Sequence, residues 1–425
     1  MTLNYFLKDI DLALFLRIVA TLIRTIIPIS IIWLSSDENL GIYYLSISIL
    51  TFGATLAGLD LGLFFSSKYI REDLKGKRRV FNLFLKQGLR INLTAIILGL
   101  VGLFIFSYLP FPTFLILVPL LISIESLSLE FGKFYRNLGF VLYASFRDLI
   151  RSIILALTIF FSLLFFDTIL VFETLCVYIL CLFSLVIFES ASFGIIKKII
   201  VSDFFVPKSI LSSTKDLFLI SGPQFVQNQV NNLIMVLERT FLSVTLGLDI
   251  QGIYSFFWSF VSVISSLFSF PYIAKNYQSL IKDIPNFSQI KTYKSVIKLF
   301  FQLFALVLLL TIVCFVSEPV AKYFFNQFSY SFYFLFAAVG LSVLANTYIS
   351  ASGPIFGQIK FFWFSNILTL LIALPYFCIP MIYNSSLEIE LHFNSVMLLI
   401  TIVSILELIL RIRFFYKQIF ILQKA

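Results

Sequence analysis

The chain has 425 residues, of which 60% are hydrophobic and only 12% charged, and its formal net charge is +9. A mean hydropathy of +1.01 excludes an ordinary soluble domain. In a soluble protein the positive charge would suggest a nucleic-acid partner. Here it fits basic connections that face an anionic membrane leaflet, so we expect membrane lipids and no nucleic acid as partners.

Long hydrophobic segments alternate with short connections along the chain. We count about twelve segments that are long enough to cross a bilayer, so the sequence predicts an all-α polytopic membrane protein. The predicted spans are Leu12–Leu34, Gly41–Ser66, Gly88–Leu109, Phe114–Gly132, Leu149–Phe166, Ile169–Gly194, Leu217–Leu246, Gly252–Ala274, Leu299–Ser317, Phe328–Ala351, Phe361–Tyr383 and Phe393–Ile412.

Basic residues lie almost entirely on one side of these segments. With the N-terminus inside, roughly 27 of the 31 Lys and Arg fall in inside connections or tails. The outside connections are acidic or neutral, as at Asp37, Glu38 and Asp249. This asymmetry predicts that both termini are cytoplasmic. The basic connections are interpreted as topological signals, with capture of a phospholipid or a lipid-linked substrate as the alternative.

The connections leave no room for a soluble catalytic or nucleotide-binding domain, because none exceeds roughly 25 residues. The sequence has no GxxxxGK[ST] phosphate-binding motif, so direct use of ATP is not expected. The cysteines all fall inside predicted spans and lack the spacing of metal ligands. We therefore expect a protein that is not an enzyme and that has no cofactor, metal site or disulfide.

A short repeat relates the two halves of the chain. Gly41-Ile42-Tyr43 opens the second span and Gly252-Ile253-Tyr254 opens the eighth, each after an acidic turn. Halves that enter the membrane in the same direction form a parallel repeat, a common transporter plan with the substrate site between the halves. We therefore predict an N-terminal six-helix lobe, residues 1–200, and a C-terminal six-helix lobe, residues 201–425.

Two arginines in the first span need an explanation, because a charge at the centre of a span costs about 2.5–3.5 kcal/mol on insertion scales. Arg17 and Arg24 are seven residues apart and share one helix face. Arg17 lies at the depth of Asp60 on the second span, so a salt bridge between them is one explanation. Arg24 has no carboxylate at equal depth, which favours a water-filled cavity and an anionic substrate.

The seventh span is the most polar, and most of its polar residues fall in a stripe roughly 100° wide on one helix face. Such a stripe cannot face lipid. Hydrogen bonds between helices would explain it as packing, whereas so many polar groups ending in an arginine favour a hydrated pathway. The stripe consists of Gln224, Asn228, Asn231, Asn232 and Arg239, flanked by Gln227 and Glu238.

Further acids are predicted inside the fourth, sixth and twelfth spans. Each of them can pair with an arginine, bind a proton or coupling cation, or lie near enough to an interface to be solvated, and the sequence does not rank these roles. They are Glu125, Glu130, Glu173, Glu189 and Glu407.

With twelve spans, two parallel halves, arginines in the first and seventh spans and a second span that reads GIYYLSISILTFGATLAGLDLGL, the chain resembles the bacterial polysaccharide flippases. These are the O-antigen or capsule-repeat translocases of the multidrug/oligosaccharidyl-lipid/polysaccharide exporter superfamily. The resemblance covers the whole chain. It rests on this architecture, on the Gly-hydrophobic-Tyr that opens the second and eighth spans, and on the segment Gly58–Leu63.

The resemblance implies an alternating-access flippase of the bacterial cytoplasmic (inner) membrane, with a cationic cavity between two six-helix bundles. The implied substrate is an oligosaccharide on undecaprenyl pyrophosphate, an O-antigen (lipopolysaccharide) or capsular repeat unit, and a polysaccharide polymerase is a further candidate partner. The candidate substrate-binding residues are Arg17, Arg24, Arg239, Gln224, Asn228, Asn231 and Asn232, with Asp60 and Glu238 in structural or coupling roles.

Two alternatives remain open. A multidrug antiporter of the same superfamily would need acids in its cavity, and an arginine-lined cleft disfavours cationic drugs. A membrane-embedded polysaccharide polymerase or glycosyltransferase would need catalytic groups at the outer face, where Asp37 and Glu38 are the only hint. The sequence predicts neither the sugar that is carried, nor the coupling ion, nor the oligomeric state.

Overall fold

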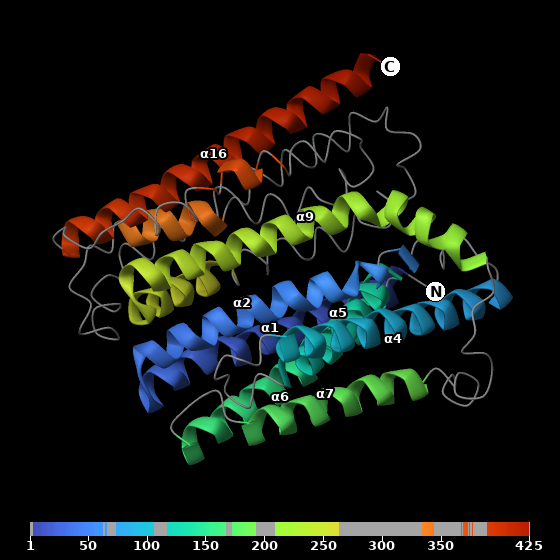
Figure 1. Ribbon diagram of the computed structural model, residues 1–425. Helices are drawn as coiled ribbons and strands as arrows, with labels where there is room; N and C mark the ends of the chain where they lie inside the picture. Colours follow the sequence, from blue (N-terminus) through green and yellow to red (C-terminus); the bar gives the residue numbers. More distant parts are fainter. Residues whose placement is uncertain are drawn as a thin grey trace. The chain divides into compact units, whose positions relative to one another are not determined.

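The computed structural model describes residues 3–62, 64–65, 74–105, 117–138, 140–166, 172–192, 209–262, 334–343 and 389–424, with a few further positions between 367 and 376 (Figure 1). These residues are helical apart from short turns, and none of them belongs to a strand. The predicted span Leu299–Ser317 and most of Phe361–Tyr383 lie outside the described residues.

Long helices make up nearly all of the described part. Residues 248–262 and Phe334–Val343 form shorter helices. The long helices are α1 (Leu3–Leu34), α2 (Asp37–Gly58), α4 (Leu74–Ile105), α5 (Leu117–Asn137), α6 (Val141–Phe166), α7 (Phe172–Ser192), α9 (Ser209–Leu246) and α16 (Ile389–Lys424).

Five of the described helices contain a stretch that is long and apolar enough to cross a membrane. Their outer surfaces carry large apolar side chains, such as Phe161 and Phe165 on α6 and Leu98 on α4, as a lipid-facing surface requires. The predicted class, an all-α polytopic membrane protein, is confirmed. The five stretches are Leu12–Leu34, Asp37–Gly58, Val80–Val101, Val141–Phe166 and Phe393–Leu410.

Several helices run further than the predicted spans, into the basic connections. α4 begins at Leu74, α5 continues to Asn137, α6 begins at Val141, and α9 begins at Ser209. Lys and Arg are good helix formers, so a connection rich in them extends a helix instead of ending it. The connection after α5 is therefore only a few residues long.

The second span is interrupted, which the sequence did not predict. α2 ends at Gly58, and Leu59 and Asp60 follow with φ angles of 50° and 51° before the helix resumes. A left-handed conformation costs a non-glycine residue roughly 1–2 kcal/mol. The Glu130 carboxylate compensates, because its Oε2 accepts a hydrogen bond of 2.6 Å from the backbone N–H of Gly62.

The chain divides into two compact units. Unit 1 comprises Met1–Ser35 and Ser46–Asn232, and unit 2 comprises Ser36–Leu45 and Leu233–Ala425. α2 and α9 therefore each contribute residues to both units. The predicted lobes, residues 1–200 and 201–425, stay a prediction of the sequence repeat.

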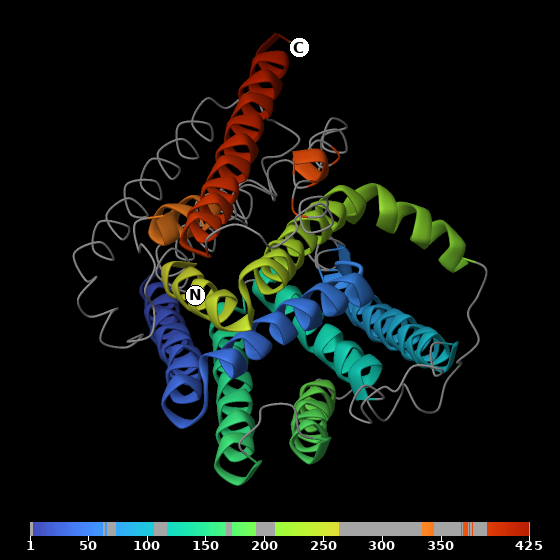
Figure 2. The ribbon, with the colours of Figure 1, turned by 60° about the vertical axis from the view of Figure 1, so that its left-hand side comes forward.

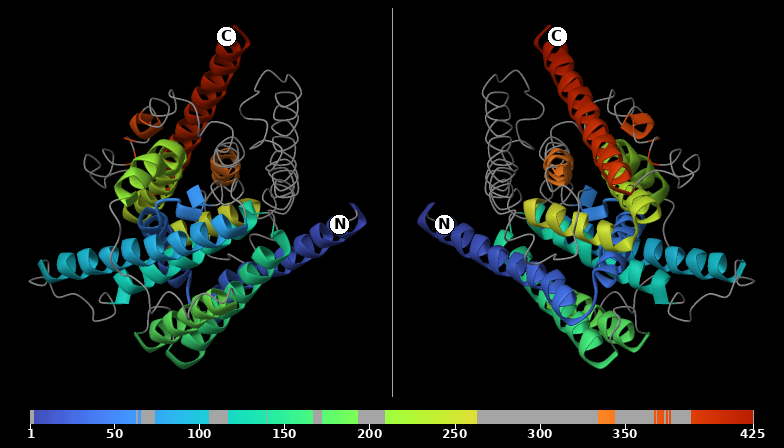
Figure 3. Two further views of the ribbon diagram at one scale, coloured as in Figure 1. Left: turned by 90° about the vertical axis from the view of Figure 1, so that its right-hand side faces the viewer. Right: turned by 90° about the vertical axis from the view of Figure 1, so that its left-hand side faces the viewer.

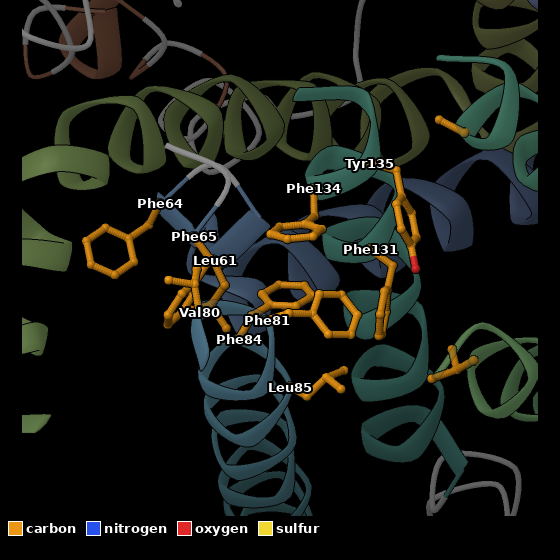
Figure 4. Packing of buried hydrophobic residues seen from close by; sticks show 12 residues of the cluster. Leu61, Phe64, Phe65, Val80, Phe81, Phe84, Leu85, Phe131, Phe134 and Tyr135 are labelled. Carbon is orange, nitrogen blue, oxygen red and sulfur yellow. The ribbon is translucent and has the colours of Figure 1, made fainter. Parts of the chain in front are cut away.

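Unit 1 is organised around α5 and α6. α1 packs along α6, and α7 contacts both α5 and α6 (Figures 2 and 3). α4 packs on α5 through aromatic rings (Figure 4). Phe84 of α4 and Phe134 of α5 stack with ring centroids 4.7 Å apart and planes 10° apart. This packing fixes the C-terminal end of α5, which carries Lys133 and Arg136.

Candidate functional site

Three arginines and one aspartate form a cluster in unit 1, here called the arginine cluster: Arg17, Arg24, Arg136 and Asp148. Arg17 and Arg24 come from α1, Arg136 from the end of α5, and Asp148 from the start of α6. Arg17 lies within electrostatic range of the other three charges. The packing of α1 along α6 brings the two ends of this cluster together.

The ion pair and the hydrogen bond described in the arginine cluster involve side chains that are partly or fully exposed. An Nη2 of Arg136 lies 3.7 Å from an Oδ2 of Asp148, and the two side chains are 39% and 20% exposed. Arg24 is exposed, and its Nε donates a hydrogen bond of 2.8 Å to the Oγ of Ser152, one helical turn after Asp148 on α6. In the described part of the chain, no carboxylate lies within salt-bridge distance of Arg24. Three guanidinium groups therefore lie around Asp148 in this cluster.

Asp60 does not pair with Arg17, which corrects one of the two explanations of Arg17. The Asp60 carboxylate instead accepts a charged hydrogen bond from the Nζ of Lys133, and its Oδ2 accepts one of 2.9 Å from Asn228. Lys133 also lies 2.8 Å from Glu130. The sequence argument matched depths along the membrane, but it placed Lys133 in a connection and so missed the nearer cation.

The polar stripe of α9 contacts α2 in unit 1. The Nδ2 of Asn228 donates to Asp60, and the Nδ2 of Asn232 donates to the Oγ1 of Thr55 at 2.9 Å. These contacts are the interhelical packing that was one of two explanations of the stripe. A substrate-binding role for either amide stays a prediction. The side chains of Gln224 and Gln227 lie outside the described part, and Asn231 is half-buried.

Arg239 is buried in unit 2 and held by aromatic rings. Its Nη1 donates a hydrogen bond of 3.0 Å to the carbonyl oxygen of Tyr44. Its guanidinium carbon lies 5.4 Å from the ring centroid of Tyr44 and 5.4 Å from that of Trp258. Two cation–π contacts and 4% exposure leave little of the group to a ligand in this conformation.

Glu238, next to Arg239, lies in a network of hydroxyl groups in unit 2. Its Oε1 accepts a hydrogen bond of 2.5 Å from the Tyr254 hydroxyl, and its Oε2 lies 3.4 Å from the Oγ of Ser342. Trp258 donates through Nε1 to the same Oγ at 3.1 Å. Glu238 is 5% exposed, so these neutral groups replace water around a buried carboxylate.

The remaining acids have separate outcomes. Glu125 forms an ion pair with Arg151 of α6, and Glu130 one with Lys133, so both pair with cations. Glu173 is exposed at the start of α7, and Glu407 is buried on α16. The side chain of Glu189 lies outside the described part. The described residues contain no His, Cys, Asp and Glu group suited to a metal ion.

Sequence reasoning missed several residues. Arg136 and Asp148 were assigned to a connection, and only the short turn between α5 and α6 brings them to α1. Gln229 was outside the predicted stripe, yet both polar atoms of its amide are buried and have no hydrogen-bond partner in the described part. Its place in an amide-rich span was the only signal that the sequence offered.

No protein-family model and no curated protein matches the sequence. Solved structures do match it. A structure described as MATE in complex with MaL6 is 12% identical, with a TM-score of 0.64 over 98% of this chain and 97% of that chain. The outward-facing conformation of a multidrug resistance MATE family transporter of the MOP superfamily is 13% identical, with a TM-score of 0.63 over the same shares. The chain has the fold of these transporters.

A third similar structure is a MOP superfamily transporter from Pyrococcus furiosus, described by a reverse polarity of its binding pocket that suggests a different function. It is 14% identical, with a TM-score of 0.52 over 96% of this chain and 95% of that chain. MATE transporters have twelve transmembrane helices, in agreement with the predicted number of spans.

Proposed function

We propose that this chain is an alternating-access transporter whose substrate carries an anionic group, and that the substrate is an oligosaccharide linked to undecaprenyl pyrophosphate. The arginine cluster is the observation that carries this proposal. Its three guanidinium groups, and the exposure of Arg24, whose printed partner is the neutral Ser152, suit an anion that arrives from outside the protein. Arginine binds phosphate oxygens with two parallel hydrogen bonds, which gives the cluster geometric as well as electrostatic selectivity.

The membrane strengthens the argument from charge. An arginine near the centre of a span costs about 2.5–3.5 kcal/mol on insertion scales, and one hydrogen bond to a neutral serine does not neutralise it. Packing of α1 on α6 does not require a charge at Arg24, because Arg24 is exposed. A pyrophosphate group would supply a negative charge for Arg24.

The second candidate is a multidrug antiporter, and the solved structures with this fold favour it. Their descriptions name multidrug resistance transporters. A cationic drug would be repelled by the arginine cluster, so in this case the carboxylates of unit 2, Glu238 and Glu407, would have to bind it. The Pyrococcus furiosus transporter, which has this fold, is described by a reverse polarity of its binding pocket that suggests a different function.

Arg24→Ala in a strain that lacks the chromosomal gene separates the two candidates. For a flippase, surface polysaccharide should fall about ten-fold or more, whereas Arg24→Lys should keep part of the activity because a point charge loses the bidentate geometry. Arg413→Ala, an exposed arginine of α16 in unit 2, is the matched control and should leave export unchanged. Full export by Arg24→Ala would exclude the flippase proposal.

The same strains answer the drug question. A multidrug antiporter with carboxylates as its binding groups should lose resistance to cationic dyes in Glu238→Gln and keep it in Arg24→Ala. Loss of polysaccharide in Arg24→Ala together with unchanged dye resistance in both variants would exclude the multidrug candidate.

The proposed orientation places both termini in the cytoplasm and the protein in the bacterial inner membrane. A cysteine at Asn39 should react with an impermeant maleimide added to intact cells, and one at Lys77 should not. Labelling at Lys77 would invert the proposed topology. A polysaccharide polymerase remains a candidate partner. We propose that the chain itself is a transporter and not an enzyme.

A further inference from the structure

The two copies of the repeated tripeptide meet in unit 2. Gly41 lies in the second turn of α2 and Gly252 in the second turn of the helix at residues 248–262. A Cβ atom on Gly41 would lie 2.0 Å from the carbonyl oxygen of Leu248, and one on Gly252 would lie 2.7 Å from the amide nitrogen of Gly41. Since these obstacles are backbone atoms that cannot rotate away, only glycine fits at either position.

Buried residues lie beside both glycines in the sequence. Leu40, Gln251 and Ser255 are each 0% exposed. In the proposed topology, both helices begin at the outer face of the membrane. The glycine contact therefore joins the outer ends of the second and eighth spans, the two places where the repeat puts equivalent residues.

Two features oppose this contact. The Oε1 of Gln251 is buried and has no hydrogen-bond partner in the described part of the chain, although its Nε2 donates to Ser255 at 2.9 Å. An unmade hydrogen bond of a buried group is unfavourable and would be restored by water. The charge of Asp249 also acts on Asp37, so two like charges flank the contact.

We propose that the Gly41–Gly252 contact is the outer gate of the transporter: it closes the outer end in this conformation and separates when the protein opens outward. The inference rests on the proposed alternating-access transport. Close backbone packing holds the gate shut, while the unpartnered Gln251 oxygen and the Asp37–Asp249 repulsion favour the hydrated, open arrangement. Because these favourable and unfavourable interactions oppose each other, the contact can exist in a closed and an open state instead of being permanently closed.

The repeat explains why the gate uses a pair of glycines. Two equivalent helix starts related by a parallel repeat meet at the axis between the halves, where each presents the same face to the other. Glycine at this point lets the two backbones touch, and any larger residue would hold them apart. The gate then explains why the glycine recurs in Gly41-Ile42-Tyr43 and Gly252-Ile253-Tyr254.

The test follows the solvent access of Ser255, one turn inside Gln251. Ser255→Cys is placed in a background whose native cysteines (Cys176, Cys181, Cys314 and Cys378) are serine. Its rate of reaction with an impermeant maleimide, added outside intact cells, reports gate opening. Gly41→Ala should raise this rate about ten-fold, because its methyl group meets the Leu248 carbonyl and disfavours the closed state.

Gly53→Ala is the matched control. It makes the same substitution in the same helix, but its Cβ meets the end of the Ile122 side chain, which can move, at 2.8 Å. It should leave the Ser255→Cys labelling rate unchanged. Equal labelling in Gly41→Ala and Gly53→Ala would overturn the gate.

A second variant should act in the opposite direction and leaves both glycines in place. Asp249→Asn removes the repulsion of Asp37 and should slow labelling about three-fold, whereas Glu38→Gln removes a charge from the same helix end and should not. Unchanged labelling in Asp249→Asn would also count against the gate. Neither readout needs a substrate, so failure of the gate is distinguishable from failure of the proposed transport.

Discussion

Asp60 of unit 1 and Glu238 of unit 2 are both buried carboxylates, but they are neutralised in different ways. Asp60 receives the ammonium group of Lys133 and the amide of Asn228. Glu238 receives only hydroxyl groups, from Tyr254 and Ser342, and no cation lies within salt-bridge distance of it in the described part. Arg239 acts on it from a distance, and the charge of Glu407 opposes it.

The difference distinguishes Asp60, whose charge is held by an ion pair, from Glu238, whose charge can change. The charge of Asp60 is balanced by Lys133, which also pairs with Glu130, so its loss would break a three-residue ion-pair network. The charge of Glu238 is stabilised by hydroxyl dipoles and by the more distant Arg239, so a proton or a cation can replace that stabilisation without breaking a salt bridge. We therefore propose that Asp60 has a structural role and that Glu238 couples transport to an ion.

Lys133→Met should have the largest effect on this comparison. It leaves the carboxylates of Asp60 and Glu130 without their cation and should lower the free energy of unfolding by about 3 kcal/mol, the lower end of the range for a broken buried pair. The side chain of Lys133 is 26% exposed, which limits the loss. The thermal unfolding midpoint in detergent measures it. Lys133→Arg keeps the charge, so its unfolding midpoint should be close to that of the wild type. Equal midpoints for Lys133→Met and the wild type would contradict a structural role for the Asp60–Lys133 ion pair.

Glu238→Gln should affect transport instead of stability. Glutamine keeps an acceptor for Tyr254, so the free energy of unfolding should change by no more than about 1 kcal/mol. Transport should fall about ten-fold or more and lose its dependence on the coupling ion. Asp60→Asn, the comparison variant, should lower the unfolding midpoint. A Glu238→Gln protein that transports normally would remove Glu238 from the coupling mechanism.

Asn228→Ala and Asn232→Ala form a smaller matched test. Asn228 donates to a charged acceptor and should contribute about 1.5 kcal/mol, whereas Asn232 donates to the neutral Thr55 and should contribute about 0.6 kcal/mol. Unfolding midpoints rank the two variants. If Asn232→Ala is the more damaging of the pair, the acceptor charge is not what stabilises the contact of α9 with α2.

Tyr254→Phe should have the smallest effect. It removes one donor from Glu238 and leaves Ser342, so the free energy of unfolding should fall by about 0.5–1 kcal/mol. The loss in Tyr254→Phe combined with Glu238→Gln should be smaller than the sum of the two single losses, because the residues share one interaction. Additive losses would show that the hydroxyl acts elsewhere.

Much of the fold followed from hydrophobic length and the positions of the basic residues. The first span was predicted to end at Leu34, and α1 ends at the same residue. The interruption at Leu59 and Asp60 was not predictable, because neither residue is a glycine or proline. The hydrogen bond that stabilises the interruption comes from Glu130 on another helix. Helix ends in basic connections were missed because hydropathy falls there while helix propensity stays high.

The candidate site was only partly predictable, because a helical period identifies a polar face but not its partner. Arg17 and Arg24 were placed on one face of one helix, and the structure puts both in the arginine cluster. A salt bridge of Arg17 with Asp60 was one of two explanations, and Asp60 pairs with Lys133 instead, since similar depth in the membrane says nothing about which side chains are neighbours. Arg136 and Asp148 could only be found from the packing of α1 and α6.

The arginines of α1 also bear on how the protein is made. The hydrogen bond from Arg24 to Ser152 joins positions 128 residues apart, so it cannot exist until α6 has left the ribosome. During synthesis α1 must enter the bilayer with two charges that cost about 5–7 kcal/mol together at a helix centre. The mean hydropathy of 2.0 in Leu12–Leu34 works against that cost. The contacts of α1 with α6, including this hydrogen bond, can form only after the fifth predicted span has been made.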